Sequence, residues 1–263
     1  MSLRLAKQII YGFFYLVLWG GLIALAYFLF LKPAPSCFDN VKNQGESGVD
    51  CGGPCSKVCI PKEIRPIELV GDVLTFATGQ DHISLLAQVK NSNADFAAKR
   101  FNYAFSFYDA SGKLLRSIQG NSFIYASEVK YILALSEELT ATDSINKVNF
   151  SVSDVQWDSA YNFRGPPSIA IQDVKTSFQK KNGIYEGEFL AEGRITNNDT
   201  VAFPLATVVA IFSGSRGQVV GASQTQIDNL TPNESKLFSI IFPKIQDDIN
   251  ASNTKLFVYA SRR

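Results

Sequence analysis

The chain has 263 residues, of which 46% are hydrophobic and 19% are charged. Its 25 basic and 24 acidic residues give a formal net charge of +1. A nucleic-acid-binding surface needs a concentrated basic stripe, so this balance argues against nucleic acid as a partner. Outside one apolar segment near the N-terminus, about 200 residues remain, enough for two domains of ordinary size.

An uncharged apolar run occupies residues 9–31, with no Asp, Glu, Lys, Arg, Asn or Gln inside it. As a helix this run reaches about 34 Å, enough to cross a hydrocarbon core of about 30 Å. A cleaved signal peptide has a shorter apolar core followed by a small-residue cleavage site, and a buried core helix has a polar face. We therefore expect an uncleaved transmembrane helix at residues 9–31.

The charges that flank this run predict its orientation. Arg4 and Lys7 precede the run, whereas Lys32 and then mixed charges follow it. Because basic flanks stay in the cytoplasm, we expect a single-pass protein of the cell membrane. Residues 1–8 would be cytoplasmic and residues 33–263 extracytoplasmic.

The cysteines are confined to the predicted stalk, residues 32–63, at Cys37, Cys51, Cys55 and Cys59. An even number of cysteines in an extracytoplasmic segment too small for a hydrophobic core predicts two disulfides. Three pairings are open, and the sequence does not choose among them. Zinc is the lesser alternative, because a second short-spaced cysteine pair is missing and an oxidising compartment opposes free thiolates.

Oxygen ligands in the same stalk suggest a second kind of metal site. Asp39, Asn43, Glu46 and Asp50 recur every three or four residues, and calcium prefers carboxylate and amide oxygens. The spacing does not match an EF-hand loop. The favoured interpretation is a polar disulfide loop with Asn, Gly and Asp in its turns, and a calcium site at these four residues is the alternative. No other cofactor is expected.

The stalk also carries a recognisable short motif. It is formed by Cys37, Asp39, Asn43, Glu46, the run Val-Asp-Cys-Gly-Gly at residues 49–53, and Cys55. This stretch resembles a short Cys-rich motif of secreted and surface-anchored microbial proteins. The resemblance covers under a tenth of the chain, and it implies an extracytoplasmic location rather than an activity.

From Ile64 onward, short alternating apolar runs are separated by clusters of Asn, Gly, Asp and Ser, which is typical of an all-β protein. Four segments recur in the same order about 106 residues later: 83–91 with 189–197, 105–115 with 210–220, 128–135 with 234–241, and 148–152 with 254–258. We expect two copies of one domain, residues 64–162 and 168–263, joined by a linker at residues 163–167.

Alternation and turn residues predict the architecture of each copy. The side chains expected to point inward are Ile83, Leu85, Ala87 and Val89 in the first copy, and Phe189, Ala191, Gly193 and Ile195 in the second. Turns are expected at residues 91–93, 109–112, 182–183, 197–199 and 214–217. About seven strands over about 95 residues predict an immunoglobulin-like β-sandwich in each copy.

The first copy resembles the FxLYD family of bacterial and archaeal surface domains. The residues that carry the resemblance are Phe105-Ser-Phe-Tyr-Asp109, with residues 89–91 before them and Gly112 after them, and Phe107 replaces the leucine of the motif. The second copy reads Ala210-Ile-Phe-Ser-Gly214 and lacks the tyrosine and the aspartate. The family implies an extracytoplasmic β-sandwich and supplies no catalytic residues.

Candidates for catalysis are few. The only histidine, His82, precedes a predicted strand, and two acidic pairs, Glu137-Glu138 and Asp247-Asp248, fall in predicted polar loops. No nucleophile elbow, P-loop or dinucleotide-binding motif occurs. We therefore expect solvated loop charges and no enzyme activity.

These observations predict a membrane-anchored extracytoplasmic module of the cell envelope that has an interaction or structural role. Its partner would be an envelope protein or a polysaccharide. The alternative is a calcium-dependent surface adhesin or sensor that uses the Cys-rich loop. A third hypothesis is an enzyme subunit whose active site lies in another chain.

Overall fold

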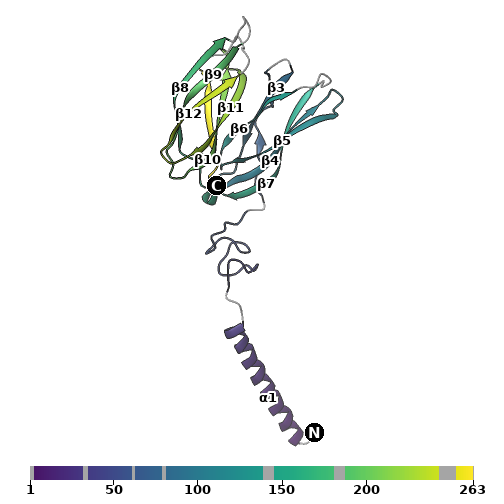
Figure 1. The fold of residues 1–263 in the computed structure, drawn as a ribbon. Helices are drawn as coiled ribbons and strands as arrows, with labels where there is room; N and C mark the ends of the chain where they lie inside the picture. The colour runs from purple at the N-terminus through teal and green to yellow at the C-terminus, as the bar shows by residue number, and fades with distance from the viewer. Residues whose placement is uncertain are drawn as a thin grey trace. The chain divides into compact units, whose positions relative to one another are not determined.

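The structure is a computed structural model that describes residues 3–31, 35–60, 63–78, 81–138, 145–180, 187–242 and 253–262 (Figure 1). The chain divides into two compact units, Met1–Cys59 and Ile60–Arg263. The first unit holds an apolar helix and the cysteine segment. The second unit holds all of the named β-strands.

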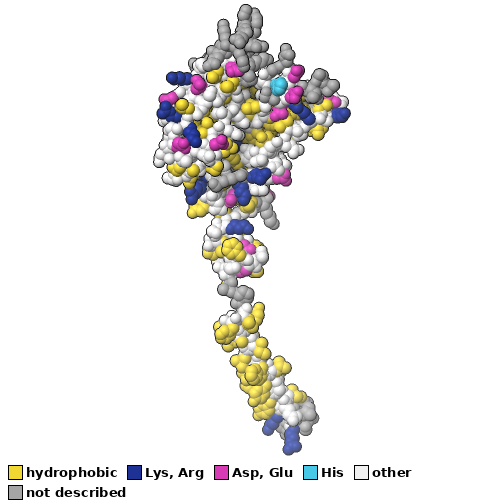
Figure 2. Space-filling model, viewed as in Figure 1, with side chains coloured by type: hydrophobic (Ala, Val, Ile, Leu, Met, Phe, Trp, Pro, Cys, Tyr) yellow, Lys and Arg dark blue, Asp and Glu magenta, His cyan; other side chains and the backbone are white. Residues whose placement is uncertain are grey.

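The first unit begins with helix α1, Leu3–Ala26, which continues as a π-helical turn, η1, Tyr27–Leu31. The most apolar stretch of 18 residues within Lys7–Leu31 has a mean hydropathy of 2.2, and none of that stretch is buried. Apolar side chains therefore cover the helix surface (Figure 2). This helix is long and apolar enough to cross a membrane.

The second unit contains two β-sandwiches, and the first of them has seven strands. They are β1 Glu68–Leu69, β2 Leu74–Ala77, β3 His82–Lys90, β4 Phe96–Tyr108, β5 Leu114–Ile124, β6 Val129–Glu138 and β7 Lys147–Ser159. Strands β1 and β2 pair with one edge of β3 and β6 with the other, and we call these four strands the β3 sheet. The order β5-β4-β7 forms the opposing β4 sheet.

A short helix, α2 Ala160–Phe163, leads to the second sandwich. Its strands are β8 Ile169–Lys180, β9 Gly187–Asn197, β10 Phe203–Ser213, β11 Val219–Leu230, β12 Ser235–Phe242 and β13 Lys255–Ala260. The order β12-β9-β8 forms the β9 sheet, and the order β11-β10-β13 forms the β10 sheet.

Both sandwiches have the strand order of an immunoglobulin-like domain. All pairings are antiparallel. In the first sandwich β3 and β6 share one sheet, and β4 pairs with β5 and β7 in the other. In the second sandwich β9 and β12 share one sheet, and β10 pairs with β11 and β13 in the other. The predicted fold class, two tandem immunoglobulin-like sandwiches behind an N-terminal apolar helix and a disulfide-rich segment, is confirmed.

Alternation along the strands builds the two hydrophobic cores. Leu85, Ala87 and Val89 in β3 point into the core of the first sandwich as expected, and Ile83 packs against its edge. Phe189, Ala191 and Ile195 in β9 occupy the same positions in the second core. Each fully buried large apolar side chain contributes about 1.5–3 kcal/mol relative to its exposed state, so these alternating sets supply much of the stability.

The turn between β4 and β5 and the turn between β10 and β11 have the same geometry. Gly112 and Gly217 both have a φ of 81°, a left-handed conformation that glycine adopts without strain. Gly112 N donates to Asp109 O at 3.1 Å, and Gly217 N donates to Gly214 O at 3.0 Å. The predicted turns at 109–112 and 214–217 are therefore present, whereas the turn at 182–183 lies outside the described residues.

Two buried asparagines, Asn91 and Asn197, organise the turns after β3 and β9. Asn91 Nδ2 donates to Phe96 O at 2.7 Å and to Tyr125 O at 2.9 Å. Asn197 Nδ2 donates to Val201 O at 2.8 Å and to Leu230 O at 3.1 Å. The two amides, 106 positions apart in the sequence, thus each join a turn to a distant strand.

The acceptor side of the two asparagines also matches. Asn91 Oδ1 accepts from Asn93 N at 3.0 Å, and Asn197 Oδ1 accepts from Asp199 N at 2.9 Å. Both contacts are Asx turns, as residues 91–93 and 197–199 predicted. Both asparagines are completely buried.

Two segments differ from what the sequence led us to expect. Glu137 and Glu138 are the last residues of β6, opposite Ile83 and His82, and do not lie in a loop, because the β3–β6 ladder continues past a register shift. Phe163, the first residue of the predicted linker, ends α2 and is only 6% exposed, since its ring packs against that of Tyr125 with centroids 4.9 Å apart.

Candidate functional site

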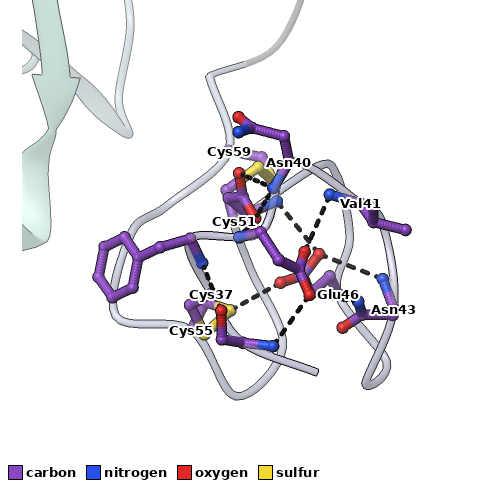
Figure 3. Close-up of a disulfide and its surroundings, with 12 residues drawn as sticks. Cys37, Asn40, Val41, Asn43, Glu46, Cys51, Cys55 and Cys59 are labelled. Carbon is purple, nitrogen blue, oxygen red and sulfur yellow. Dashed lines mark hydrogen bonds between the residues drawn. A yellow bond between two sulfur atoms is a disulfide. The ribbon is translucent and has the colours of Figure 1, made fainter. Parts of the chain in front are cut away.

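Two disulfides, Cys37–Cys55 and Cys51–Cys59, hold the segment after the apolar helix (Figure 3). The predicted disulfide framework is confirmed, and the pairing that the sequence left open is resolved. No cysteine is free. In this bridged state the four cysteines cannot bind zinc, because a cysteine binds zinc as a thiolate and a disulfide has none.

Acidic side chains organise the backbone inside this segment. Asp50 Oδ1 accepts from Asp39 N at 3.0 Å and from Asn40 N at 3.1 Å. Glu46 Oε2 accepts from Asn43 N at 3.3 Å and from Asp50 N at 3.1 Å. Each carboxylate thus satisfies two backbone donors that no regular secondary structure engages.

Asp39 has the same role at the start of the segment. Its carboxylate accepts from Ser36 N at 3.0 Å, from Val41 N at 2.9 Å and from Asn43 Nδ2 at 2.8 Å. The hydrogen bonds from Ser36 and Asn43 hold the pKa of Asp39 below its ordinary value, because they favour the ionised carboxylate. The charge of Asp39 is thus part of the loop's structure.

Glu46 is the buried centre of the segment, at 5% exposure. Its Oε1 lies 3.0 Å from Cys55 Sγ, which has no hydrogen to donate because the sulfur is in a disulfide. Cys37, Glu46 and Cys55 offer atoms within 4.8 Å of one another, but two of the three are these bridged sulfurs. This trio is consequently a structural contact.

The four predicted calcium ligands do come together. Asn43 bonds to Asp39, Glu46 bonds to the backbone of Asn43 and Asp50, and Asp50 bonds to the backbone of Asp39. Each of the three carboxylates accepts hydrogen bonds from N–H donors of the loop, which explains the regular spacing of these residues without an ion. Asn43 Oδ1 is enclosed and makes no hydrogen bond within the described residues. A calcium site here stays a prediction.

The second candidate site lies between the two sandwiches. The outer face of the β3 sheet packs against the outer face of the β10 sheet, with β11 lying against β2, β3 and β6 (Figure 1). A shared apolar cluster joins them: Phe76, Leu86, Leu133, Val209, Ile211, Ala222 and Tyr259. Because side chains from both sandwiches are buried in one cluster, the second unit packs as one body.

Hydrogen bonds between the two sandwiches reinforce this cluster. Tyr125 Oη donates to Ala260 O at 2.9 Å and accepts from Arg262 N at 3.2 Å. Tyr131 N donates to Tyr259 Oη at 3.1 Å. Burial raises the pKa of Tyr125 to about 12 and also raises the pKa of Tyr259, so both hydroxyls keep their protons at neutral pH.

Beside the cluster the two sandwiches enclose a cleft of about 410 Å³, which we call the inter-sandwich cleft. The first sandwich contributes strands β4, β5 and β6 to its walls, and the second contributes β10, β11, Tyr259 and Ser261. Aromatic, amide and hydroxyl side chains line it around one lysine, Lys130.

Lys130 is the most unusual ionisable residue of this region. It is 5% exposed, and its Nζ donates to Phe123 O at 2.9 Å. The same atom lies 3.4 Å from the centroid of the Phe123 ring and 4.8 Å from that of Tyr259. Burial lowers the pKa of Lys130 to about 7, although the nearby Glu128 carboxylate acts in the opposite direction. Burial also raises the pKa of Glu128.

The second sandwich contains a natural comparison, Lys236, at the matching position. Its Nζ donates to Asp228 O at 2.7 Å and to Asn229 O at 3.1 Å, and it lies 3.5 Å from a carboxylate oxygen of Glu234. Lys236 remains accessible to water, whereas Lys130 is covered by the second sandwich. The inter-sandwich packing is therefore what makes Lys130 exceptional.

The lowered pKa of Lys130 predicts a pH dependence of stability. Between about pH 7 and the ordinary lysine value of about 10.4, the unfolded chain binds a proton that the folded chain does not, so the free energy of unfolding rises with pH. One such proton contributes at most about 1.4 kcal/mol per pH unit. We expect urea denaturation midpoints to increase from pH 7 to pH 9. Lys130→Met should flatten this trend and Lys236→Met should not; equal slopes in all three proteins would contradict the assignment.

The other candidates from the sequence that the structure describes lie at the ends of two paired strands. His82 is exposed at the first position of β3. Its neighbour across the ladder is Glu138, at the solvent-exposed end of β6. Asp247 and Asp248 lie outside the described residues. The absence of enzyme activity stays a prediction.

Sequence reasoning missed Lys130, Tyr125 and Tyr259, because no local motif marks them. One signal was available in β10, where residues 205–212 are almost all apolar instead of alternating. A strand that is apolar on both faces has a second surface to cover. In this chain the neighbouring sandwich covers it.

Comparisons with known proteins add little. No family model and no curated protein sequence matches the chain. Among solved structures, red sea bream transglutaminase aligns over 77% of this chain and 32% of its own, at 10% identity and a TM-score of 0.23. The Amycolatopsis orientalis exo-chitosanase CsxA aligns over 68% of this chain and 21% of its own, at 9% identity and a TM-score of 0.22. Neither similarity bears on the function.

Proposed function

We propose that this chain is a single-pass protein of the cell envelope that holds two tandem β-sandwiches outside the membrane as an interaction or structural module without catalysis. The observation that carries the proposal is the apolar helix formed by α1 and η1. None of its most apolar stretch is buried. A continuous apolar surface of this length is unfavourable in water and favourable in a lipid bilayer.

Two further observations support the orientation. Arg4 and Lys7 precede the apolar stretch, which favours a cytoplasmic N-terminus. The disulfides Cys37–Cys55 and Cys51–Cys59 follow it, and such bridges persist in oxidising compartments. Both point to sandwiches on the outer side of the membrane.

We also propose that the two sandwiches are copies of one ancestral domain. The matching hydrogen bonds of Asn91 and Asn197, and the matching turns at Gly112 and Gly217, support this origin. A second packed copy enlarges the surface available to a partner, and loops and sheet faces of sandwiches commonly supply such surfaces.

Site-directed labelling tests the placement. Wild-type protein has no free thiol, so single cysteines at Asn149→Cys, on the exposed surface of β7, and Ser2→Cys, before the helix, can be compared directly. A membrane-impermeant maleimide should label Asn149→Cys on intact cells and Ser2→Cys only after lysis. The reverse pattern, or labelling of both only after lysis, would refute the proposed topology.

Cross-linking on intact cells tests the role. We expect the sandwiches to yield specific adducts with an envelope protein or polysaccharide, identified by mass spectrometry. Recovery of the chain alone, under conditions in which a known envelope complex is captured, would count against an interaction role.

A further inference from the structure

The inter-sandwich cleft combines features of a binding site for a polar ligand. Its volume of about 410 Å³ falls in the range of small-ligand pockets. Its lining includes the rings of Tyr131 and Tyr259 and the amides of Asn121, Gln224 and Gln226. The cleft therefore offers ring faces for apolar contact and amides for hydrogen bonding in one space.

The amides of the cleft are available for a ligand. In the part of the chain that the structure describes, the side chains of Asn121, Gln224 and Gln226 make no hydrogen bond. Gln224 and Gln226 pair with Val209 and Thr207 across the β10–β11 ladder, so all four side chains share the sheet face that borders the cleft. Each amide can both donate and accept, which suits the hydroxyl groups of a saccharide.

Lys130 places a buried amino group in the cleft, and an entering carboxylate would favour the protonated form of that group. Among the described residues, no carboxylate forms an ion pair with Lys130, whereas its counterpart Lys236 has Glu234. Lys130 Nζ has three donors, and one of them is used by Phe123 O. A carboxylate that entered the cleft would supply the missing partner in a poorly solvated setting, where such a bond is strong.

The backbone of strand β10 cannot accept an added peptide strand. Strand β10, which contributes Thr207 and Val209, is paired on both edges, with β11 and with β13. Its N–H and C=O groups are thus already used in the sheet. Recognition by β10 must therefore rely on its side chains, as is usual for small polar ligands.

We propose that the inter-sandwich cleft binds a carboxylate-bearing saccharide, such as a uronic acid unit of an envelope polysaccharide. Lys130 pairs with the carboxylate, Gln224 and Gln226 bond to ring hydroxyls, and Tyr131 and Tyr259 contact the sugar ring. This inference rests on the proposed function, because it names the chemistry of the partner that the exposed module would hold.

Calorimetric titration of the full chain in lipid nanodiscs tests the inference. The probes are oligomers of galacturonic and glucuronic acid, and the neutral controls are oligomers of galactose and glucose. We expect saturable binding of a uronic acid oligomer, at least tenfold tighter than binding of its neutral counterpart. Lys130→Met should weaken this binding at least tenfold, and the matched control Lys236→Met should leave it unchanged.

A second variant, Gln226→Ala, keeps the test decisive if Lys130→Met misfolds. Gln226→Ala removes an exposed amide at the cleft and should weaken binding about threefold to tenfold without changing the thermal denaturation curve. Absence of uronic acid binding, equal binding of the neutral oligomers, or unchanged affinity in both Lys130→Met and Gln226→Ala would overturn the inference. Such a failure leaves the maleimide labelling result intact, so the two proposals are tested separately.

Discussion

Asn91→Ala is expected to lower the free energy of unfolding of the first sandwich by about 3 kcal/mol, and Asn197→Ala to do the same in the second. Each substitution removes two amide donors and one acceptor from a site that is completely buried. The partners left behind are backbone carbonyls and an N–H group that water cannot easily reach.

The size of the effect follows from those orphaned partners. A buried polar group without a hydrogen bond costs about 1–3 kcal/mol, and each asparagine serves several of them. Alanine also leaves a small cavity, which adds to the loss. Aspartate keeps the shape but not the donors, and it adds a charge, so Asn91→Asp and Asn197→Asp should be at least as harmful as alanine.

Urea denaturation provides the measurement, and hydrogen exchange reports which sandwich opens. Asn149→Ala, on the exposed face of β7, is the matched control and should change stability by less than about 0.5 kcal/mol. A loss below about 1 kcal/mol at both buried positions would show that the two amides do not organise the sandwiches as described.

Reduction of the disulfides is expected to unfold residues 35–60 and leave the sandwiches folded. Large apolar side chains of this segment face solvent, with Phe38 86% exposed, Val41 55% and Val49 53%, so no hydrophobic core replaces the bridges. By loop-closure entropy, the bridges Cys37–Cys55 and Cys51–Cys59 each contribute about 3 kcal/mol, with the larger loop contributing slightly more.

The carboxylates would be lost together with the bridges. Asp50 and Glu46 accept hydrogen bonds from residues that the disulfides bring near them, and these bonds cannot persist once the loops open. In hydrogen exchange, the peptides from residues 35–60 should lose their protection in reductant, while those of β4 and β10 keep theirs.

Paired substitutions separate the two bridges. Cys37→Ser with Cys55→Ser removes the larger loop, and it should reduce protection more than Cys51→Ser with Cys59→Ser. Retained protection of residues 35–60 after full reduction would show that the segment is stabilised by something other than its disulfides.

Features encoded by short-range pattern were predictable. The apolar run at 9–31, the cysteine cluster and the alternating strand at 83–89 each depend on local composition and spacing, and the structure has an exposed helix, two disulfides and an inward-facing strand there. The turns at Gly112 and Gly217 were also recognisable, because they require residues that tolerate a positive φ.

Features that depend on packing between distant segments were not predictable. The disulfide pairing is decided by how the loop folds around Glu46, and spacing alone allows three pairings. In the sequence, Lys130 has the same pattern of neighbours as Lys236 and looks like an ordinary strand lysine. Only the packing of the second sandwich buries it. The pairing of β6 with β3 likewise continues to Glu137 and Glu138, which the sequence predicted to lie in a polar loop.

The crossed bridges also limit how far the segment can be stretched. Without them, the 22 peptide units from Cys37 to Cys59 would extend to about 75 Å under load. With them, the shortest covalent path runs across the Cys37–Cys55 bridge, whose Cα atoms are 5.6 Å apart, and then along four residues, or about 20 Å in all. A pull applied between the helix and the sandwiches would therefore meet a short, nearly inextensible tether.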